Sequence, residues 1–263
     1  MIVLVVTALL PVFAILAYVY FTDPDKEPWQ TLLTAFGLGA LTIVPAALCE
    51  GFLFDIFNAK NYPLVENFFC IGLTEEFFKL AVIMLYIFRH RDFNDTFDGI
   101  VYAVAASLGF AAAENVIYTL ENGFDTGILR AFTSVPGHAA FAVFMGGFVS
   151  TAKTHHFYLR TKKRTKYILL ALFVPTVVHG LYDYLLTIKQ VEIFFLLIIV
   201  IDIAAIIIIK RARKNDKSLL VNNEPLLEEK QEYFSTLFFQ PQRYIRAVLV
   251  FLQIRINKIR FRF

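Results

Sequence analysis

The chain has 263 residues, of which 58% are hydrophobic and 18% are charged, and its formal net charge is only +3. A soluble domain contains about 45–50% apolar residues, so this composition excludes an ordinary soluble enzyme and indicates a membrane protein. The two cysteines, Cys49 and Cys70, both lie in apolar runs, where packing is the expected role rather than a disulfide or a metal site.

Seven apolar segments have the length of a membrane-spanning helix, about 20 residues. They cover residues 1–21, 29–49, 65–88, 98–120, 129–152, 167–188 and 192–209. The first has no basic n-region and no small-residue cleavage site, which favours an uncleaved span over a signal peptide. The sequence therefore predicts an all-α polytopic membrane protein with about seven transmembrane helices. We expect a membrane domain over 1–210 and a basic tail over 211–263.

Lysine and arginine are concentrated in three places: the joints at 89–96 and 153–166, and the segment that follows the last span. If the helices alternate in direction, all three places lie on one side of the membrane. The positive-inside rule assigns that side to the cytoplasm. The sequence thus predicts an N-terminus outside the cell and a C-terminus inside.

The end of the tail, RYIRAVLVFLQIRINKIRFRF, carries six Lys or Arg residues and no acid. It is too basic to span a membrane and is typical of a segment that lies on anionic lipid. Its alternating final residues also allow an exposed strand. A nucleic-acid partner is not expected.

Ionisable and polar side chains interrupt five of the predicted spans, although a charge at a helix centre costs about 2.5–3.5 kcal/mol on insertion scales. At 1.5 Å per residue, Glu75, His138, His179 and Asp202 fall roughly 12–15 Å below the outer boundary, and Glu114 about 9 Å. These depths predict one polar layer slightly outside the midplane. The full set is Glu75, Glu76, Lys79, Glu114, Asn115, His138, His179, Asp183 and Asp202.

Sequence spacing indicates local partners within this layer. Lys79 lies four residues after Glu75 and three after Glu76, so it can pair with either carboxylate on one helix face. Asp183 lies four residues after His179 and can fix the tautomer of that imidazole. Pro136 and Pro175 each remove a helix hydrogen bond near the layer, which favours a water-accessible cavity.

Carboxylates and imidazoles in such a cavity suit the activation of water for hydrolysis. We expect Glu75 or Glu76 to act as the general base, and His138 and His179 to stabilise an oxyanion or bind a metal. No metal is required by a motif, since H-E-x-x-H is absent, but a divalent ion such as zinc is an open alternative. Its candidate ligands are Glu76, Glu114, His138 and His179. The expected supporting residues are Lys79, Glu114, Asn115 and Asp183, and Asp202 is expected to be structural.

Two other classes of function fit part of the pattern. Buried Glu, His and Asp also build proton- or ion-coupled carriers, although the internal repeats of many carriers are not evident here. A non-catalytic membrane protein that binds partners through its tail is the other alternative. The charged residues also have structural interpretations, an ion cluster for Glu75, Glu76 and Lys79 and interhelical hydrogen bonds for Glu114 and Asn115.

Four motifs in order resemble the PrsW family, a group of bacterial multi-spanning membrane proteases distantly similar to the CAAX prenyl endopeptidases. They are EEFFK at 75–79, FDGIVYAVAASLGFAAAENVIY at 97–118, PGHAAFAVFMG at 136–146 and HGLYDYLL at 179–186. The resemblance also includes the acidic joint DPDKEPW and covers all seven predicted spans. The basic tail is longer than expected for the family.

The resemblance implies a protease of the bacterial cytoplasmic membrane. It further implies a first-step cut in a single-pass anti-sigma factor, on the outer side, during stress signalling. Position by position, Glu75 and Glu76 match the glutamate pair, Glu114 matches an F-x-x-x-E motif, and His138 and His179 match the histidine motifs. Asp183 matches the aspartate after the last histidine. The resemblance leaves the use of a metal open.

Overall fold

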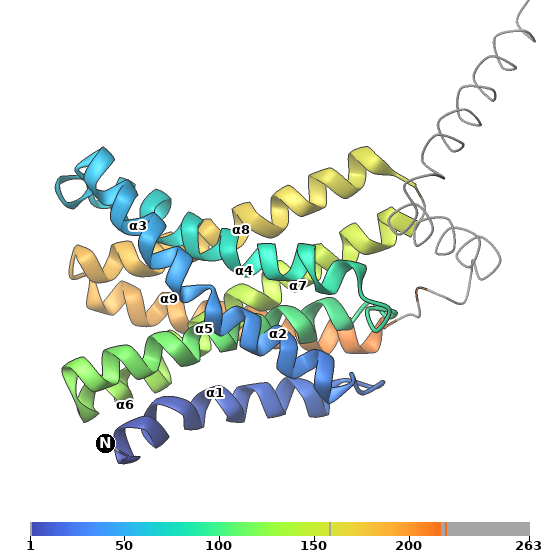
Figure 1. Ribbon diagram of the computed structural model, residues 1–263, viewed down its shortest axis with the longest axis horizontal. Helices are drawn as coiled ribbons and strands as arrows, with labels where there is room; N and C mark the ends of the chain where they lie inside the picture. The colour runs from blue at the N-terminus through green and yellow to red at the C-terminus, as the bar shows by residue number, and fades with distance from the viewer. Residues whose placement is uncertain (1, 158, 217–218, 220–263) are drawn as a thin grey trace, which may run out of the picture. The chain divides into compact units, whose positions relative to one another are not determined.

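The computed structural model describes residues 2–157, 159–216 and 219 (Figure 1). Within these residues all regular secondary structure is helical, which confirms the predicted all-α class. The basic end of the tail, with its predicted lipid-binding segment or strand, falls outside the described residues. The division into domains at residue 210 stays a prediction, although the last helix continues to Lys214.

The helices follow one another along the chain with short connections. They are α1 (Ile2–Thr22), α2 (Trp29–Leu41), α3 (Ile43–Phe57), the 3₁₀ turn Ala59–Asn61, the π-helix η2 (Val65–Gly72), α4 (Leu73–Leu85), the 3₁₀ turn Ile87–Arg89, α5 (Asp98–Asn122), α6 (Phe124–Phe132), α7 (Ser134–Phe157), α8 (Thr161–Thr187) and α9 (Val191–Lys214).

Six stretches of the described chain are long and apolar enough to cross a membrane: Val3–Thr22, Trp29–Phe57, Asp98–Asn122, Phe124–Phe157, Thr161–Thr187 and Val191–Lys214. The predicted span at 65–88 is also present, as η2 followed directly by α4. It differs from the other six because its charged residues, Glu66, Glu75, Glu76 and Lys79, lower its hydropathy.

Two prolines set the breaks within the longer stretches. Proline lacks an N–H and its ring clashes with the carbonyl four residues earlier. Accordingly α2 ends at Leu41, four residues before Pro45, and α6 ends at Phe132, four residues before Pro136. Pro136 therefore lies in the first turn of α7, where its missing N–H removes no helix hydrogen bond, so the predicted loss of a bond at Pro136 is wrong.

Two segments that were predicted to join spans are largely helical. In the joint between the spans 98–120 and 129–152, residues from Phe124 onward form α6. The basic joint at 153–166 is mostly divided between the ends of α7 and α8. Lysine and arginine are good helix formers. A stretch rich in them can therefore leave the apolar membrane core while the helix continues.

The helix α5 is the centre of the bundle, and every residue from Asp98 to Ala112 is buried. Its neighbours approach to backbone contact at glycines. A Cβ on Gly39 of α2 would lie 1.9 Å from the carbonyl oxygen of Ala106, and a Cβ on Gly146 of α7 would lie 2.4 Å from that of Gly99. Small residues of this kind let membrane helices pack closely.

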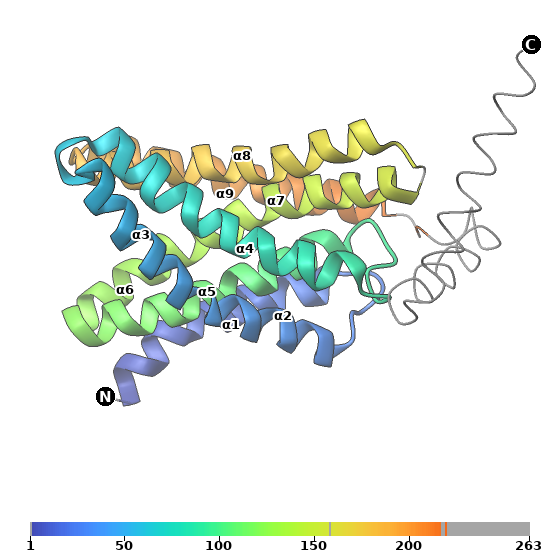
Figure 2. The same cartoon turned by 45° about the horizontal axis from the view of Figure 1, so that its top comes forward.

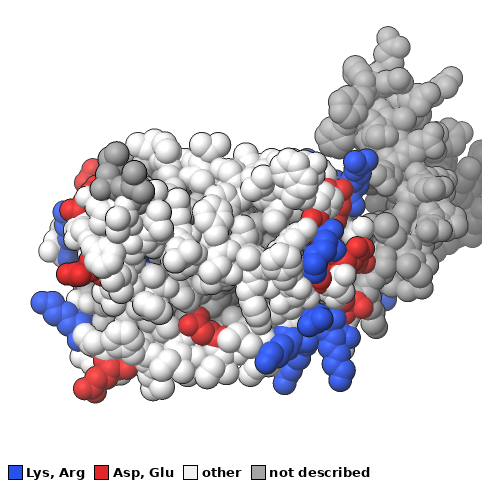
Figure 3. All heavy atoms as spheres, turned by 90° about the horizontal axis from the view of Figure 1, so that it is seen from below, with Lys and Arg blue, Asp and Glu red and all other residues white. Residues whose placement is uncertain are grey.

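The joints α1–α2, α4–α5 and α7–α8 and the end of α9 lie at one end of the bundle (Figures 1 and 2). This arrangement agrees with the alternating directions assumed from the sequence. Figure 3 shows that charged side chains gather towards the two ends of one face, with a broad and almost uncharged belt between them. Such a belt suits a surface in contact with lipid.

The glycine contacts predict a contrast between two alanine substitutions on α2. Gly39→Ala should lower the free energy of unfolding by about 1–3 kcal/mol or more, because the new methyl group meets the backbone of α5. Gly37→Ala is the matched control, since nothing lies within 4 Å of a Cβ at that position. Thermal unfolding in neutral detergent measures the difference, and equal stability of the two variants would contradict this packing.

Candidate active site

A close approach of two helices brings the first parts of the site together. Where η2 and α4 meet α8, a Cβ on Gly72 would lie 3.1 Å from the backbone nitrogen of Gly180. A Cβ on Gly180 would lie 2.6 Å from the ring of Phe68. Because both positions are glycine, the helices can pack at this distance, and Glu76 on α4 comes to face His179 on α8.

The ammonium of Lys79 is the hub of the polar cluster and is 1% exposed. It donates hydrogen bonds to Glu75 Oε2 (3.0 Å), Glu76 Oε1 (2.8 Å) and His138 Nδ1 (3.0 Å), and it lies over the ring of Phe110. An ammonium has three donors, and all three are used here. Because His138 Nδ1 accepts, the proton of this neutral imidazole lies on Nε2, which donates to Glu114 Oε2 over 2.9 Å.

His179 lies between three carboxylates. Its Nδ1 is 3.0 Å from Glu76 Oε1, and its Nε2 is 3.2 Å from Asp183 Oδ2 and 3.9 Å from Glu75 Oε2. The ring stacks on Phe141, with centroids 4.9 Å apart, and meets the His138 ring edge-on at 5.3 Å. Asp183 lies next to His179, but its Oδ2 makes no hydrogen bond in the described chain, so its predicted role in fixing the tautomer stays a prediction. Packing fixes the plane of the ring.

Arg130 joins the cluster, although it is not among the residues that the sequence pattern selects. The guanidinium binds Glu114 Oε2 at 2.8 Å, Asn115 Oδ1 at 2.7 Å and Ser134 Oγ at 2.8 Å, and it stacks over the ring of Tyr118. Its position at the boundary of a predicted span is typical of a terminal charge. In the structure α6 turns it back towards the polar layer.

Comparison with known proteins identifies the family to which this chain belongs. A family model described as "PrsW family intramembrane metalloprotease" matches residues 27–209. The chain belongs to the PrsW family. It is 39% identical to a protein named Protease PrsW from Oceanobacillus iheyensis over 176 residues, which are 67% of this chain and 79% of that protein.

Other PrsW proteins show similar coverage. The chain is 36% identical to Protease PrsW of Geobacillus kaustophilus, over 68% of this chain and 78% of that protein. It is 32% identical to Protease PrsW of Bacillus subtilis, over 70% and 83% respectively. No solved structure matches. The chain is thus a peptidase embedded in a membrane, and its substrate is a protein.

The remaining residues of the predicted layer occupy different places in this PrsW fold. Asn115 donates to the carbonyl of Ala8 and accepts from Arg130, so it supports the wall of the site from α5. Ser107, which is not a member of the predicted layer, donates to the carbonyl of His138. Asp202 is half-buried on α9, and none of the contacts that join the cluster in the described chain includes it. Helix rise places Asp202 in the layer, but its helix directs it elsewhere.

Glu50 is a further carboxylate near the cluster that was not among the predicted residues. It lies on α3 close enough to Glu75 and Glu114 for their charges to interact. The predicted second span ends at residue 49, one residue before it. The continuation of this helix to Phe57 is what places Glu50 within the membrane-spanning stretch.

The residues fit the metal that the family description implies. One donor atom each from Glu75, His138 and His179 lies within 4.8 Å of the other two. Two imidazoles and one carboxylate form a common zinc set. Four carboxylates face two cationic side chains in the cluster, and Glu76 Oε2 is buried without a hydrogen-bond partner in the described chain. An ion held at His138 Nδ1 would replace the hydrogen bond from Lys79, which would retain the two glutamates as partners.

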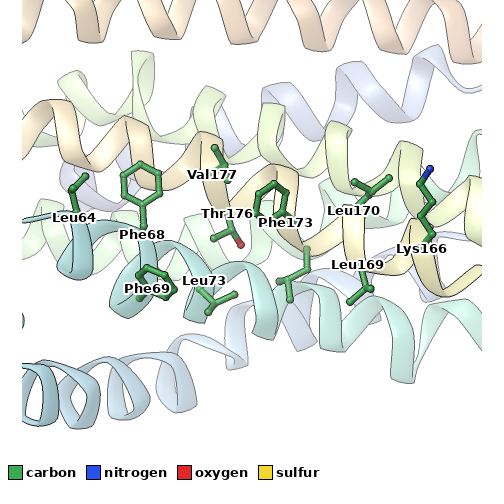
Figure 4. Close-up of a pocket in the computed structure, with 11 residues that line it drawn as sticks. Leu64, Phe68, Phe69, Leu73, Lys166, Leu169, Leu170, Phe173, Thr176 and Val177 are labelled. Carbon is green, nitrogen blue, oxygen red and sulfur yellow. The ribbon is translucent and has the colours of Figure 1, made fainter.

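An apolar groove of about 870 Å³ runs beside the site (Figure 4). It lies between η2 with the start of α4 and the helix α8, and one of its lining residues, Thr176, precedes His179 by three positions. The other lining residues are Leu64, Phe68, Phe69, Leu73, Lys166, Leu169, Leu170, Leu172, Phe173 and Val177. Its walls suit an apolar segment rather than a polar small molecule.

The pair of Arg130 and Glu114 predicts the effect of removing one buried charge. Glu114→Gln should lower the free energy of unfolding by at least about 2 kcal/mol, because Arg130 and His138 lose their shared carboxylate. Glu121→Gln is the matched control on the same helix, since Glu121 is exposed. Thermal unfolding compares the two, and an equally small effect of both would show that the network contributes little.

Proposed function

We propose that this chain hydrolyses a peptide bond of a membrane-spanning protein at the cluster formed by Glu75, Glu76, His138 and His179. One observation carries the proposal. Two carboxylates and two imidazoles, from α4, α7 and α8, meet around the buried ammonium of Lys79. A cluster needed only to hold helices together would not require an acid pair, two imidazoles and an orphaned carboxylate oxygen.

Glu76 is the proposed general base. Lys79 and His179 both bind its Oε1, which fixes the carboxylate, while Oε2 has no hydrogen-bond partner in the described chain. An oriented carboxylate with one oxygen available can take a proton from water as the water oxygen attacks the carbonyl carbon. The same carboxyl group can then return the proton to the departing amine.

Glu75, His138 and His179 are the proposed holders of a divalent metal, with zinc as the best match to the donor set. When bound, such an ion polarises a carbonyl and lowers the pKa of water. The protein residues behind these donors keep them in place. Glu76 orients His179 by accepting from its Nδ1, which leaves Nε2 for the ion, and Asp183 lies beside that nitrogen. Glu114 orients His138, and Arg130 holds Glu114.

The proposed substrate is a single-pass anti-sigma factor, cut on the outer side of the bacterial cytoplasmic membrane as the first step of a stress response. The family resemblance of the four motifs supports this class of substrate. The apolar groove beside His179 supports a substrate whose segment next to the scissile bond is apolar. The outward bias of the polar layer supports a cut near the external face, given an N-terminus outside and a C-terminus inside.

The tail is proposed as a separate cytoplasmic segment over 211–263 that binds anionic lipid through its six basic residues near the end. Binding of the tail to vesicles should weaken steeply as salt is raised. Salt-independent binding would contradict the electrostatic account of the tail without affecting the protease.

Substitution of site residues in a cleavage assay tests the proposed chemistry. Glu76→Gln and His179→Ala should each reduce cleavage of a co-expressed, tagged single-pass anti-sigma factor by at least about 10²-fold, because each removes a group that acts on the reacting atoms. Asp202→Asn is the control, since it neutralises an intramembrane carboxylate outside the cluster. Immunoblots of the membrane fraction report both expression and product.

Full cleavage by Glu76→Gln and His179→Ala proteins that insert normally would refute the catalytic assignment. An equal loss of cleavage in the Asp202→Asn protein would also contradict the assignment, because it would show that the effect is not specific to the carboxylates of the cluster. Cleavage of an unrelated single-pass protein, with the anti-sigma factor left intact, would refute only the proposed substrate.

A further inference from the structure

A second acidic cluster lies at the other end of α5, far from the site described above. It consists of Asp23 and Glu27 in the joint between α1 and α2, together with Asp98 at the start of α5. Asp98 and Glu114 are sixteen positions apart on one helix, which corresponds to about 24 Å. The two clusters are therefore separate sites.

The three carboxylates are buried, with exposures of 2% for Asp23, 4% for Glu27 and 0% for Asp98. One oxygen from each lies within 4.8 Å of the other two. Three ionised carboxylates at this distance repel one another strongly when water is excluded, so the cluster needs either protons or a cation.

Each carboxylate is anchored through one oxygen. Asp98 Oδ2 accepts the backbone N–H groups of Asn94 (2.8 Å) and Asp95 (2.7 Å), and Asp23 Oδ1 accepts that of Asp25 (3.2 Å). Glu27 Oε2 accepts the hydroxyl of Tyr102. These bonds hold all three side chains in fixed positions before any ligand arrives.

The opposite oxygens of the two aspartates are left without a donor. Asp23 Oδ2 and Asp98 Oδ1 are buried and make no hydrogen bond in the described part of the chain. Orphaned oxygens on carboxylates that are 98% or more buried are rare in native proteins and call for a ligand. Two of them, on two members of one buried three-carboxylate cluster, indicate a cation.

The charges of Lys26 and Lys153 reach Asp23 and Asp98 respectively, but neither lysine forms an ion pair with the described cluster. Lys26 donates to the backbone carbonyls of Phe21 and Asp23, and Lys153 donates to that of Phe88. Among the described residues no ion pair joins a lysine or arginine to Asp23, Glu27 or Asp98. The charges of Asp92 and Asp216 reach the cluster and add to its negative potential.

We propose that Asp23, Glu27 and Asp98 form a second metal site, for a hard divalent cation such as Ca²⁺ or Mg²⁺. All the donors are oxygens, and no imidazole or thiol is in the set, which favours these ions over zinc. Oxygens on opposite sides of a Ca²⁺ ion are roughly 4.6–5.2 Å apart, and the observed limit of 4.8 Å fits that sphere. A bound cation would tie the α1–α2 joint to the start of α5.

The alternative is that the carboxyl groups share protons without a metal. Burial raises the pKa of Asp23 and of Glu27 to about 7 each, so protons and a cation compete for these groups near neutral pH. Glu27 and Asp98 lie close enough to share a hydrogen bond once one of them is protonated. That proton would leave Asp23 Oδ2 unpaired, whereas a cation accounts for both orphaned oxygens. The two interpretations differ in whether a divalent ion binds.

The chain carries its own reporter for this test, because its single tryptophan, Trp29, is two residues from Glu27. Tb³⁺ is used as the probe in neutral detergent, with excitation of Trp29. We expect sensitised Tb³⁺ emission that Ca²⁺ or Mg²⁺ competes away. Asp98→Asn and Glu27→Gln should each weaken Tb³⁺ binding by at least about tenfold, since each removes a charged ligand.

Two control variants test whether Tb³⁺ binds at this cluster rather than elsewhere on the chain. Asp25→Asn removes an exposed acid from the same joint and should leave Tb³⁺ binding unchanged. His179→Ala should also leave it unchanged, which distinguishes this cation from one at the proposed catalytic cluster. Absence of competable emission from the wild-type protein would overturn the proposal without reference to any variant. Equal losses in Asp25→Asn and Asp98→Asn would overturn it as well.

Discussion

The buried ammonium of Lys79 is the interaction on which the polar interior depends. Removing an ammonium from water is costly unless its donors are all satisfied, and here two carboxylates and an imidazole satisfy them. The same ammonium lets Glu75 and Glu76 lie side by side on one helix within an apolar bundle. Without it, two adjacent buried carboxylates would repel each other with no counter-charge on their own helix.

Close packing of the helices brings the polar side chains of the site within reach of one another. Lipid gives no hydrophobic drive for helices to associate, so close contact and polar bonds must hold them together. Gly39 and Gly146 let α2 and α7 reach the backbone of α5, and Gly180 lets α8 reach η2. Each contact fixes a helix that carries or supports a polar group, so packing and site are set by the same residues.

Much of the site could be predicted because a regular helix converts sequence position into depth. Helix rise alone places Glu75, His138 and His179 in one layer, and the structure brings them together. Depth does not give direction, which is why helix rise also places Asp202 in the layer although α9 turns it away. The seven predicted segments are all present as helices, whereas the breaks at Leu41 and Phe132 follow from prolines four residues later.

Other features of the site depend on which helices lie side by side, which a single sequence does not show. Arg130 reaches Glu114 only because α6 folds back beside α5, and Glu50 approaches the site only because α3 continues past the predicted boundary. The acidic joint with Asp23 and Glu27 has the pattern of an ordinary polar loop between two spans. The third member of its cluster, Asp98, is more than seventy residues away in the chain.

The central claim is that Glu75, His138 and His179 hold a metal at the place where the peptide bond is cut. X-ray absorption at the zinc edge of purified, proteolytically active protein tests it most directly. The account predicts one zinc per chain, with two imidazole nitrogens and a carboxylate oxygen at about 2.0–2.1 Å, and loss of this signal in His179→Ala. Full activity in metal-free protein, or a zinc ion without imidazole ligands, would contradict it.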